Sequence, residues 1–408
     1  MTDTPTAPER CPVTDWATDF DHADSQWAAD PYPIWEELRE RCPVAHSPRY
    51  GGVWLPVRHD DVAAIAYDTE HFTSRSVIVT EGRPLMPAPQ GIAPPISSDP
   101  PFHHGARRLL LPAFSPKAVA PLASITRDYC EGLLDALEGH DVVDAAREYA
   151  QHIPVQVIAT MLGFPPEDAD AFRGFVHNAL EAVDVPFEQR LQNFAALDAY
   201  LGAQIEDHLA NPRDDLTTFL LTAEMDGERL NTEHVRGSMA LLLIAGIDTT
   251  WSAIGASIWH LAKTPADRER LVAEPDLLPT AVEELLRAYA PVTMARLVKD
   301  DFEYNGCPMK KDEWVLLPFP AANRDPEAFE RADEVVLDRV ENRHAAFGLG
   351  IHRCAGSNLA RMELTVALEV WLRRFPVFSL ADPEAVTWSG GQVRGPRTLP
   401  VAVGAAGR

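Results

Sequence analysis

The most chemically distinctive stretch of the sequence is a glycine-framed cysteine, Cys354, in the run FGLGIHRCAG at residues 347–356. Apolar residues then recur at three- and four-residue steps from Leu359 to Val370, which predicts an amphipathic helix that begins just after the cysteine. A helix N-terminus favours a thiolate, and a lone thiolate is a soft ligand suited to haem iron. The glycines let the backbone pass close to a flat surface. The alternative for any single cysteine is a small buried hydrophobe.

An acid and an alcohol stand inside a long apolar stretch. The periodicity predicts a helix over residues 232–263, and its middle reads AGIDTT. We expect Leu241, Ala245, Asp248 and Thr249 to share one face of this helix. The Thr249 hydroxyl either bonds back to a helix carbonyl or donates a hydrogen bond to dioxygen held over an iron, with Asp248 delivering protons from solvent.

Two pairs of polar residues at helical spacing are weaker signals. His103 and Arg107 lie four residues apart after a Pro-Pro helix start, so they share a face that could hold two carboxylates; the alternative is a solvated basic helix end. Glu284 and Arg287 lie three residues apart and can form an ion pair. Most ion pairs of this spacing are surface features of little energetic weight.

The composition limits the classes of protein that fit these motifs. The chain has 408 residues, a 46% apolar fraction and a formal charge of -25, which argue for a sizeable core and against nucleic-acid or anionic-membrane partners. Its five scattered cysteines form no Cys-x-x-Cys pair, which argues against a disulfide framework, a zinc site or an iron–sulfur cluster. The polar N-terminus has no signal-like segment, and the longest apolar run spans about nine residues against the ~20 of a membrane helix. We therefore expect a cytoplasmic protein whose residues 1–15 are disordered.

The motifs are similar to landmarks of the cytochrome P450 family, in the same order, over roughly residues 30–403. The resemblance implies a mainly α fold with a small β region (α+β) and a single haem-thiolate monooxygenase domain over residues 16–408. It implies haem b between the long central helix and the cysteine-loop helix, with Cys354 as the iron ligand. The implied reaction inserts one oxygen atom from O2 into a C–H or C=C bond. Within the family, the sequence most resembles the soluble bacterial members that receive electrons from an external ferredoxin.

The resemblance also assigns roles to single residues. Asp248 and Thr249 would deliver protons, and Glu284 with Arg287 would brace the core. Many relatives have a further arginine that joins this pair; here the positions read ADEV at residues 332–335, so Arg331, Arg339 or a histidine would substitute. The implied haem contacts, besides Cys354, are His103, Arg107, Ala245, Arg296, Phe347, Gly348, His352 and Gly356.

The expected substrate is a compact, mainly apolar molecule such as a terpenoid or a substituted aromatic. A carboxylate-bearing substrate held by Arg75 or Arg83, next to or within the irregular loop at residues 76–98, stays open. The expected lining is Ile96, Leu241, Ile244, Ala245, Val292 and Val393, with Thr293 and Gln392 as the polar candidates.

Electrons are expected from an acidic [2Fe–2S] ferredoxin and its reductase, because the chain shows no flavin or iron–sulfur motif of its own. The docking site would lie near Arg108, His344, Arg353 and Arg361 on a monomeric protein. Two other functions fit the cysteine loop: a peroxide-driven haem-thiolate peroxygenase and a non-catalytic haem sensor.

Overall fold

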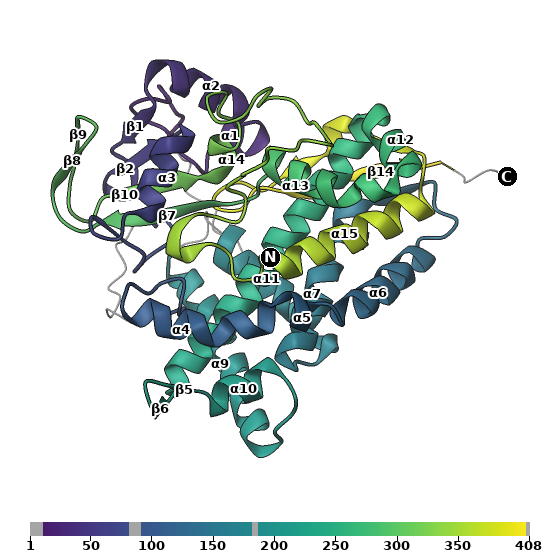
Figure 1. The fold of residues 1–408 in the computed structure, drawn as a ribbon, viewed down its shortest axis with the longest axis horizontal. Helices are drawn as coiled ribbons and strands as arrows, with labels where there is room; N and C mark the ends of the chain where they lie inside the picture. Colours follow the sequence, from purple (N-terminus) through teal and green to yellow (C-terminus); the bar gives the residue numbers. More distant parts are fainter. Residues whose placement is uncertain (1–10, 81–90, 182–186, 405–408) are drawn as a thin grey trace, which may run out of the picture.

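The computed structural model describes residues 11–80, 91–181 and 187–404 (Figure 1). Helices make up most of it, and a five-stranded sheet with four smaller ones completes it, which confirms the expected mainly α fold with a small β region. The α-helices are α1 Ser25–Ala29, α2 Tyr32–Arg41, α3 His59–Tyr67, α4 Phe102–Leu110, α5 Pro116–Val119, α6 Leu122–Ala136, α7 His152–Leu162, α8 Ala169–Val176, α9 Phe187–Ala210, α10 Leu216–Thr222, α11 Thr232–Lys263, α12 Pro265–Ala273, α13 Leu278–Ala288, α14 Phe319–Ala322 and α15 Ser357–Arg374. The strands are β1 Val44–Ser47, β2 Val53–Pro56, β3 Phe72–Thr73, β4 Val142–Asp144, β5 Glu224–Met225, β6 Glu228–Arg229, β7 Thr293–Val298, β8 Phe302–Tyr304, β9 Cys307–Met309, β10 Trp314–Pro318, β11 Phe378–Leu380, β12 Thr387–Trp388, β13 Pro396–Thr398 and β14 Pro400–Val403.

The main sheet has the strand order β1-β2-β10-β7-β3 and is covered on both faces. Side chains alternate between the faces: Ala295 and Leu297 of β7 pack with α2, whereas Val298 packs with α3 on the other face. Arg296 therefore shares its face of β7 with Met294 and Val298. This register turns a buried arginine away from the α2 side of the sheet.

Helix α11 runs through the centre of the molecule, between α7 and α15 (Figure 1). Its 32 residues match the predicted helix at residues 232–263. The Asn231 side chain caps its first turn by accepting a 2.8 Å hydrogen bond from the His234 N–H, and Pro265 follows its end. By length and composition α11 could cross a membrane, but most of its apolar window is buried by protein, as in a core helix.

Glu284 and Arg287 form a fully buried ion pair on α13, with Nη2 to Oε1 at 2.8 Å, so the surface alternative is wrong for this pair. Arg339 takes the place of the arginine that the sequence lacks: its Nε lies 2.9 Å from Glu284 Oε2. Arg331 instead pairs with Glu334 at the surface. Burial raises the pKa of Glu284, but hydrogen bonds from the two guanidinium groups outweigh it and lower the pKa overall.

The start of the chain differs from the expectation of disorder over residues 1–15. Residues 1–10 lie outside the described part, but residues 11–15 are anchored. Asp15 pairs with Arg41 at 2.7 Å, and the Cys11 carbonyl accepts a 3.0 Å hydrogen bond from Arg49. The expectation therefore fails for residues 11–15, whose side chains and carbonyls have partners farther along the chain.

Candidate active site

The cysteine loop is closed by a 2.7 Å hydrogen bond from the Cys354 N–H to the Phe347 carbonyl. It contains two glycines with positive φ, and a Cβ on one of them, Gly350, would lie 2.3 Å from the Ala66 carbonyl oxygen of α3. Only glycine allows both this conformation and this close approach. Helix α15 begins at Ser357, so the cysteine lies just before a helix N-terminus, as predicted.

The thiol of Cys354 is exposed but densely surrounded by protein atoms, and the pKa reflects both facts. Burial raises the pKa above the ordinary thiol value, while the Gly356 N–H and the Arg107 and Arg353 guanidinium groups oppose the rise. The helix end therefore does not by itself produce a thiolate, which corrects the expectation drawn from sequence. Coordination to a metal cation is what would deprotonate this thiol.

Three polar side chains in the same region form no ion pair or hydrogen bond with a carboxylate of the described residues, although the charge of Asp99 opposes the lowering of the pKa of two of them, His103 and Arg296. Both ring nitrogens of His103 and the Nε2 of His352 have no hydrogen-bond partner, and the two rings lie 4.4 Å apart between centroids. The Arg296 guanidinium bonds to the Ala295 carbonyl at 2.8 Å and forms no ion pair. Burial lowers the pKa of Arg296 to about 10, of His103 to about 4 and of His352 to about 2. Such a cluster of donors fits the two propionate carboxylates of a haem.

Arg107 connects helix α4 to the cysteine loop. Its Nη2 donates a hydrogen bond to the carbonyl of Arg353, the residue that precedes the cysteine. Burial lowers the pKa of Arg107, while the negative charge of a Cys354 thiolate would raise it. Because His103 lies one helical turn earlier on the same helix, α4 contributes both a donor to the cluster and a clamp on the loop.

The polar residues of α11 lie on two faces rather than one. Ala245 is exposed in the middle of a mostly buried helix, and the Thr249 hydroxyl donates a 2.9 Å hydrogen bond to its carbonyl. Asp248, by contrast, is fully buried. The expected common face thus holds for Ala245 and Thr249 but not for Asp248, because one residue along a helix turns the side chain by about 100°. The back-bonded alternative for Thr249 is the conformation present.

Sequence reasoning missed the partner of Asp248. Arg397 of β13 donates to its Oδ1 at 2.6 Å and to the Ser252 hydroxyl at 3.0 Å, and its guanidinium lies over the Trp251 ring at 4.3 Å. A Cβ on Gly395 would lie 2.3 Å from the Ser252 side chain, so β13 needs glycine there to approach α11 this closely. The two charges are 149 residues apart in the chain, a separation that no spacing rule connects.

Four of the six expected substrate residues are partly buried, Val393 is buried and Ala245 is exposed. Val292 pairs with Val393 in an isolated antiparallel bridge that joins the start of β7 to the tail. The polar candidates are less available: Gln392 donates its Nε2 hydrogen to the Val77 carbonyl, and Thr293 is buried. The remaining expected residues of this set, which the structure leaves partly buried, are Ile96, Leu241 and Ile244.

Arg75 and Arg83 were the candidates for holding a substrate carboxylate. Arg75 lies 3.8 Å from Asp312, a long pair whose members are each about a third exposed. Its positive charge is therefore shared with an acid of the protein, and solvent screens the pair. Arg83 lies outside the described residues.

The cationic residues near the cysteine loop fall into two groups. Arg361 and His344 share Glu283, at 2.6 and 3.2 Å, and Arg361 also stacks over Phe347. Burial would raise the pKa of Glu283, but hydrogen bonds from these two residues lower it to about 2. Arg108 and Arg353 are exposed, and the described residues offer them no ion pair.

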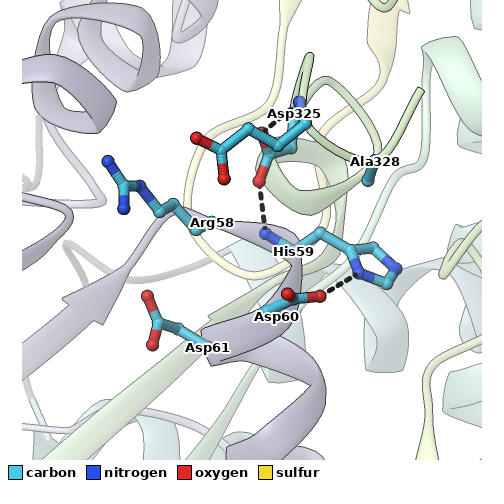
Figure 2. A pocket seen from close by; sticks show the side chains of 7 residues that line it. Arg58, His59, Asp60, Asp61, Asp325 and Ala328 are labelled. Atoms are coloured by element: carbon cyan, nitrogen blue, oxygen red, sulfur yellow. Dashed lines mark hydrogen bonds and ion pairs between the residues drawn. The ribbon is translucent and has the colours of Figure 1, made fainter. Parts of the chain in front are cut away.

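A separate pocket lies at the surface, at the start of α3, and Figure 2 shows its side chains. It is lined mainly by charged residues, and the buried Asp325 accepts a 2.7 Å hydrogen bond from the His59 N–H. None of the expected site residues lines it. We assign it a structural role, because Asp325 satisfies the helix N-terminus.

Comparisons with known proteins agree on one family. The family profile described as "Cytochrome P450" matches residues 150–388. Nocardicin C N-oxygenase of Nocardia uniformis subsp. tsuyamanensis is 35% identical, over 92% of this chain and 96% of that protein. Vitamin D(3) 25-hydroxylase of Pseudonocardia autotrophica is 34% identical, over 92% and 94%. The crystal structure of CYP109E1 from Bacillus megaterium in complex with testosterone superposes with a TM-score of 0.86 at 30% identity, covering 93% of this chain and 100% of that one.

Proposed function

The chain belongs to the cytochrome P450 family, and from that premise we propose how its own residues carry out the family's reaction. The protein is a haem-thiolate monooxygenase, and the bound haem supplies the reductive activation of O2. We propose residues 16–408 as one cytoplasmic haem domain with Cys354 as the iron ligand. The observation that carries this assignment is the cluster of buried, unpaired donors beside the cysteine loop.

Two kinds of contact are proposed to hold the haem: polar contacts to its propionates and packing of the cysteine loop against its macrocycle. His103, His352 and Arg296 would bind the propionates, since a carboxylate would satisfy donors that the protein leaves unpaired. Gly348, Phe347 and the other loop residues would pack against the macrocycle, and Gly356, whose Cβ position lies 3.9 Å from the Cys354 Sγ, leaves the sulfur accessible.

Thr249 and Asp248 are the proposed proton-handling residues. The Thr249 hydroxyl stands on the exposed Ala245 face of α11 and donates its one hydrogen to the Ala245 carbonyl, so it would have to rotate away from that carbonyl before it could donate to dioxygen. Asp248 would take part from a face of the same turn about 60° away, where its contact with Arg397 orients the carboxyl group. For Asp248 to pass a proton to Thr249, its carboxyl group would first have to break its contact with Arg397.

The proposed substrate is a compact, mainly apolar small molecule. The support is that the nearby polar groups are already engaged: Gln392 with the Val77 carbonyl, Arg75 with Asp312. The names of the relatives do not indicate one substrate class, because they refer to molecules as different as nocardicin C, vitamin D(3) and mycinamicin IV. A mainly apolar lining favours ligands that need no charged anchor.

An acidic [2Fe–2S] ferredoxin is the proposed electron donor. Arg108 and Arg353 are the strongest candidates for docking it, because Glu283 already neutralises Arg361 in part. In a chain of formal charge -25, exposed unpaired arginines beside the cysteine loop would steer an acidic partner to this face. Arg108→Glu should lower the rate of ferredoxin-driven reduction at least several-fold at low salt, whereas Lys311→Glu, the same charge change in the exposed β9–β10 turn, should not.

The decisive test of the haem-thiolate assignment is the spectrum of the reduced protein with carbon monoxide. Wild type should show the red-shifted Soret band of a thiolate ligand, and Cys354→Ala should lose it. A wild-type protein without that band would refute the assignment. Product formation with O2, ferredoxin and reductase, compared with product formation with peroxide alone, then separates a monooxygenase from a peroxygenase.

A further inference from the structure

The segment that precedes helix α4 is a self-contained turn at residues 91–98, called here the 91–98 turn. The Ala93 N–H donates to the Ser97 hydroxyl at 2.8 Å, and the Ser97 N–H returns a 3.2 Å hydrogen bond to the Ala93 carbonyl. Gly91 has a φ of 69°, and a Cβ there would lie 2.1 Å from the Ser97 carbonyl oxygen. These internal bonds and the close approach at Gly91 hold the turn in a compact conformation.

Helix α11 holds this unit through two adjacent residues near its start. The buried Ser238 hydroxyl donates a 3.1 Å hydrogen bond to the Pro94 carbonyl. At Gly237 a Cβ would lie 2.3 Å from the Ile92 carbonyl oxygen and 2.9 Å from Pro94 Cδ. The missing side chain of Gly237 therefore sets how closely the turn approaches the helix, and Ser238 fixes it at that distance.

The contact lies on the same stripe of α11 as the reaction site. Ser238, Leu241, Ala245 and Thr249 follow at steps of three and four residues, so they line one face. Ser238 precedes Ala245 by seven residues, about 10 Å along the helix axis. The 91–98 turn therefore stands at one end of the helix face that borders the substrate.

We propose that Gly237 and Ser238 are positioning residues that set the size limit of the substrate, by fixing the 91–98 turn as the end wall of the site along α11. The wall is apolar: Ile92 is 66% exposed and Ile96 is partly buried. The inference rests on the proposed apolar substrate and adds to it a limit on length along the helix. A side chain at position 237 would push the wall outward, because the Ile92 carbonyl would have to retreat by about 1 Å to reach ordinary contact.

A series of 1-alkylimidazoles of increasing chain length tests this without knowledge of the natural substrate. Each ligand binds the haem iron through its ring nitrogen, so the Soret shift reports its dissociation constant. While a methylene enters an apolar space, affinity should rise by roughly four-fold per carbon. In wild type the rise should stop at the length at which the chain meets the 91–98 turn.

Gly237→Ala and Ser238→Ala should move that optimum to longer chains, so that the longest ligands gain about ten-fold relative to the shortest. Gly202→Ala is the matched control, because a Cβ at this helical glycine meets no atom within 4 Å. The dependence of affinity on chain length in Gly202→Ala should match that of wild type. If Gly237→Ala does not fold, Ser238→Ala decides, since it removes one hydrogen bond and adds no bulk.

Two outcomes would overturn the inference. One is an unchanged chain-length profile in the folded variants. The other is an equal loss of affinity for every ligand, unsubstituted imidazole included, which would show a general structural role. The spectrum of the reduced protein with carbon monoxide is recorded for wild type and for each variant. Absence of the red-shifted Soret band in wild type would refute the haem-thiolate assignment. A variant that shows this band but has an unchanged chain-length profile would refute only the role of Gly237 and Ser238.

Discussion

The ion pair between Asp248 and Arg397 makes a quantitative prediction about stability. The two groups lie 2.6 Å apart, with side-chain exposures of 0% and 13%. Removing one partner of a pair this buried typically costs about 3–5 kcal/mol, because the other charge stays desolvated. Arg397→Met keeps apolar bulk over the Trp251 ring and removes the charge. We expect its free energy of unfolding, measured by urea titration of the haem-free chain, to fall by about 3 kcal/mol.

The control for this prediction is an arginine–aspartate pair of similar distance at the surface. Arg236 lies 2.8 Å from Asp198, with exposures of 30% and 60%, so Arg236→Met should cost at most about 1 kcal/mol. The double variant Asp248→Asn/Arg397→Met should lose less than the sum of its single variants, with a coupling energy of about 1–3 kcal/mol. A cost for Arg397→Met no larger than that for Arg236→Met, or additivity within about 0.5 kcal/mol, would refute the reasoning.

Three further predictions follow from the same contacts. Arg339→Ala should lower the free energy of unfolding by about 3 kcal/mol, because it strips a guanidinium from the buried Glu284, while Arg331→Ala, in a pair about half exposed, should cost under about 1 kcal/mol; urea unfolding of both compares them. The pKa of His103 is about 4 in the folded haem-free chain against 6.5 in the unfolded chain, so its contribution to stability is present above pH 6.5 and is lost as the pH falls toward 4. His103→Gln should therefore flatten the plot of unfolding free energy against pH between 6.5 and 4. An unchanged slope would contradict the lowered pKa of His103. Asp248→Asn should lower product formation per electron pair consumed by about 100-fold if the carboxyl handles protons, and coupled turnover at the wild-type level would exclude that role.

The local motifs were predictable because each is written within a few residues. The cysteine loop, the bounds of α11 and the α4 pair all depend on glycine conformations, caps and helical spacing, which are properties of a short stretch. The Glu284–Arg287 pair was placed correctly, but the choice of Arg339 as its third member was not decidable, because it depends on how the chain folds back after α14.

Asp248 and Arg397 show why site features that depend on tertiary contacts could not be predicted from the sequence. The helical repeat alone put Asp248 within 60° of the Ala245 face, a difference that decides between facing the substrate and facing β13. What settled it was a tertiary contact with a strand far along the chain, made possible by Gly395. The Cys354 thiol escaped for a related reason: the helix end lowers the pKa of a thiol, but the surrounding atoms raise it by more.

The buried polar groups of this protein divide into those that the chain pairs itself and those that it leaves without a partner among the described residues. Glu284 pairs with two guanidinium groups and Asp248 with one, so burying these carboxylates is offset within the protein. Arg296 and His103 are buried too, and no carboxylate of the described residues forms an ion pair or hydrogen bond with either side chain, although the negative charge of Asp99 opposes the lowering of both pKa values. Buried donors without a hydrogen-bond partner cost stability in the haem-free chain, and an anionic ligand bound there would recover that cost. On the proposed assignment, the haem contributes to folding through its propionates as well as through the thiolate, and loss of either contact should weaken the fold as well as the reaction.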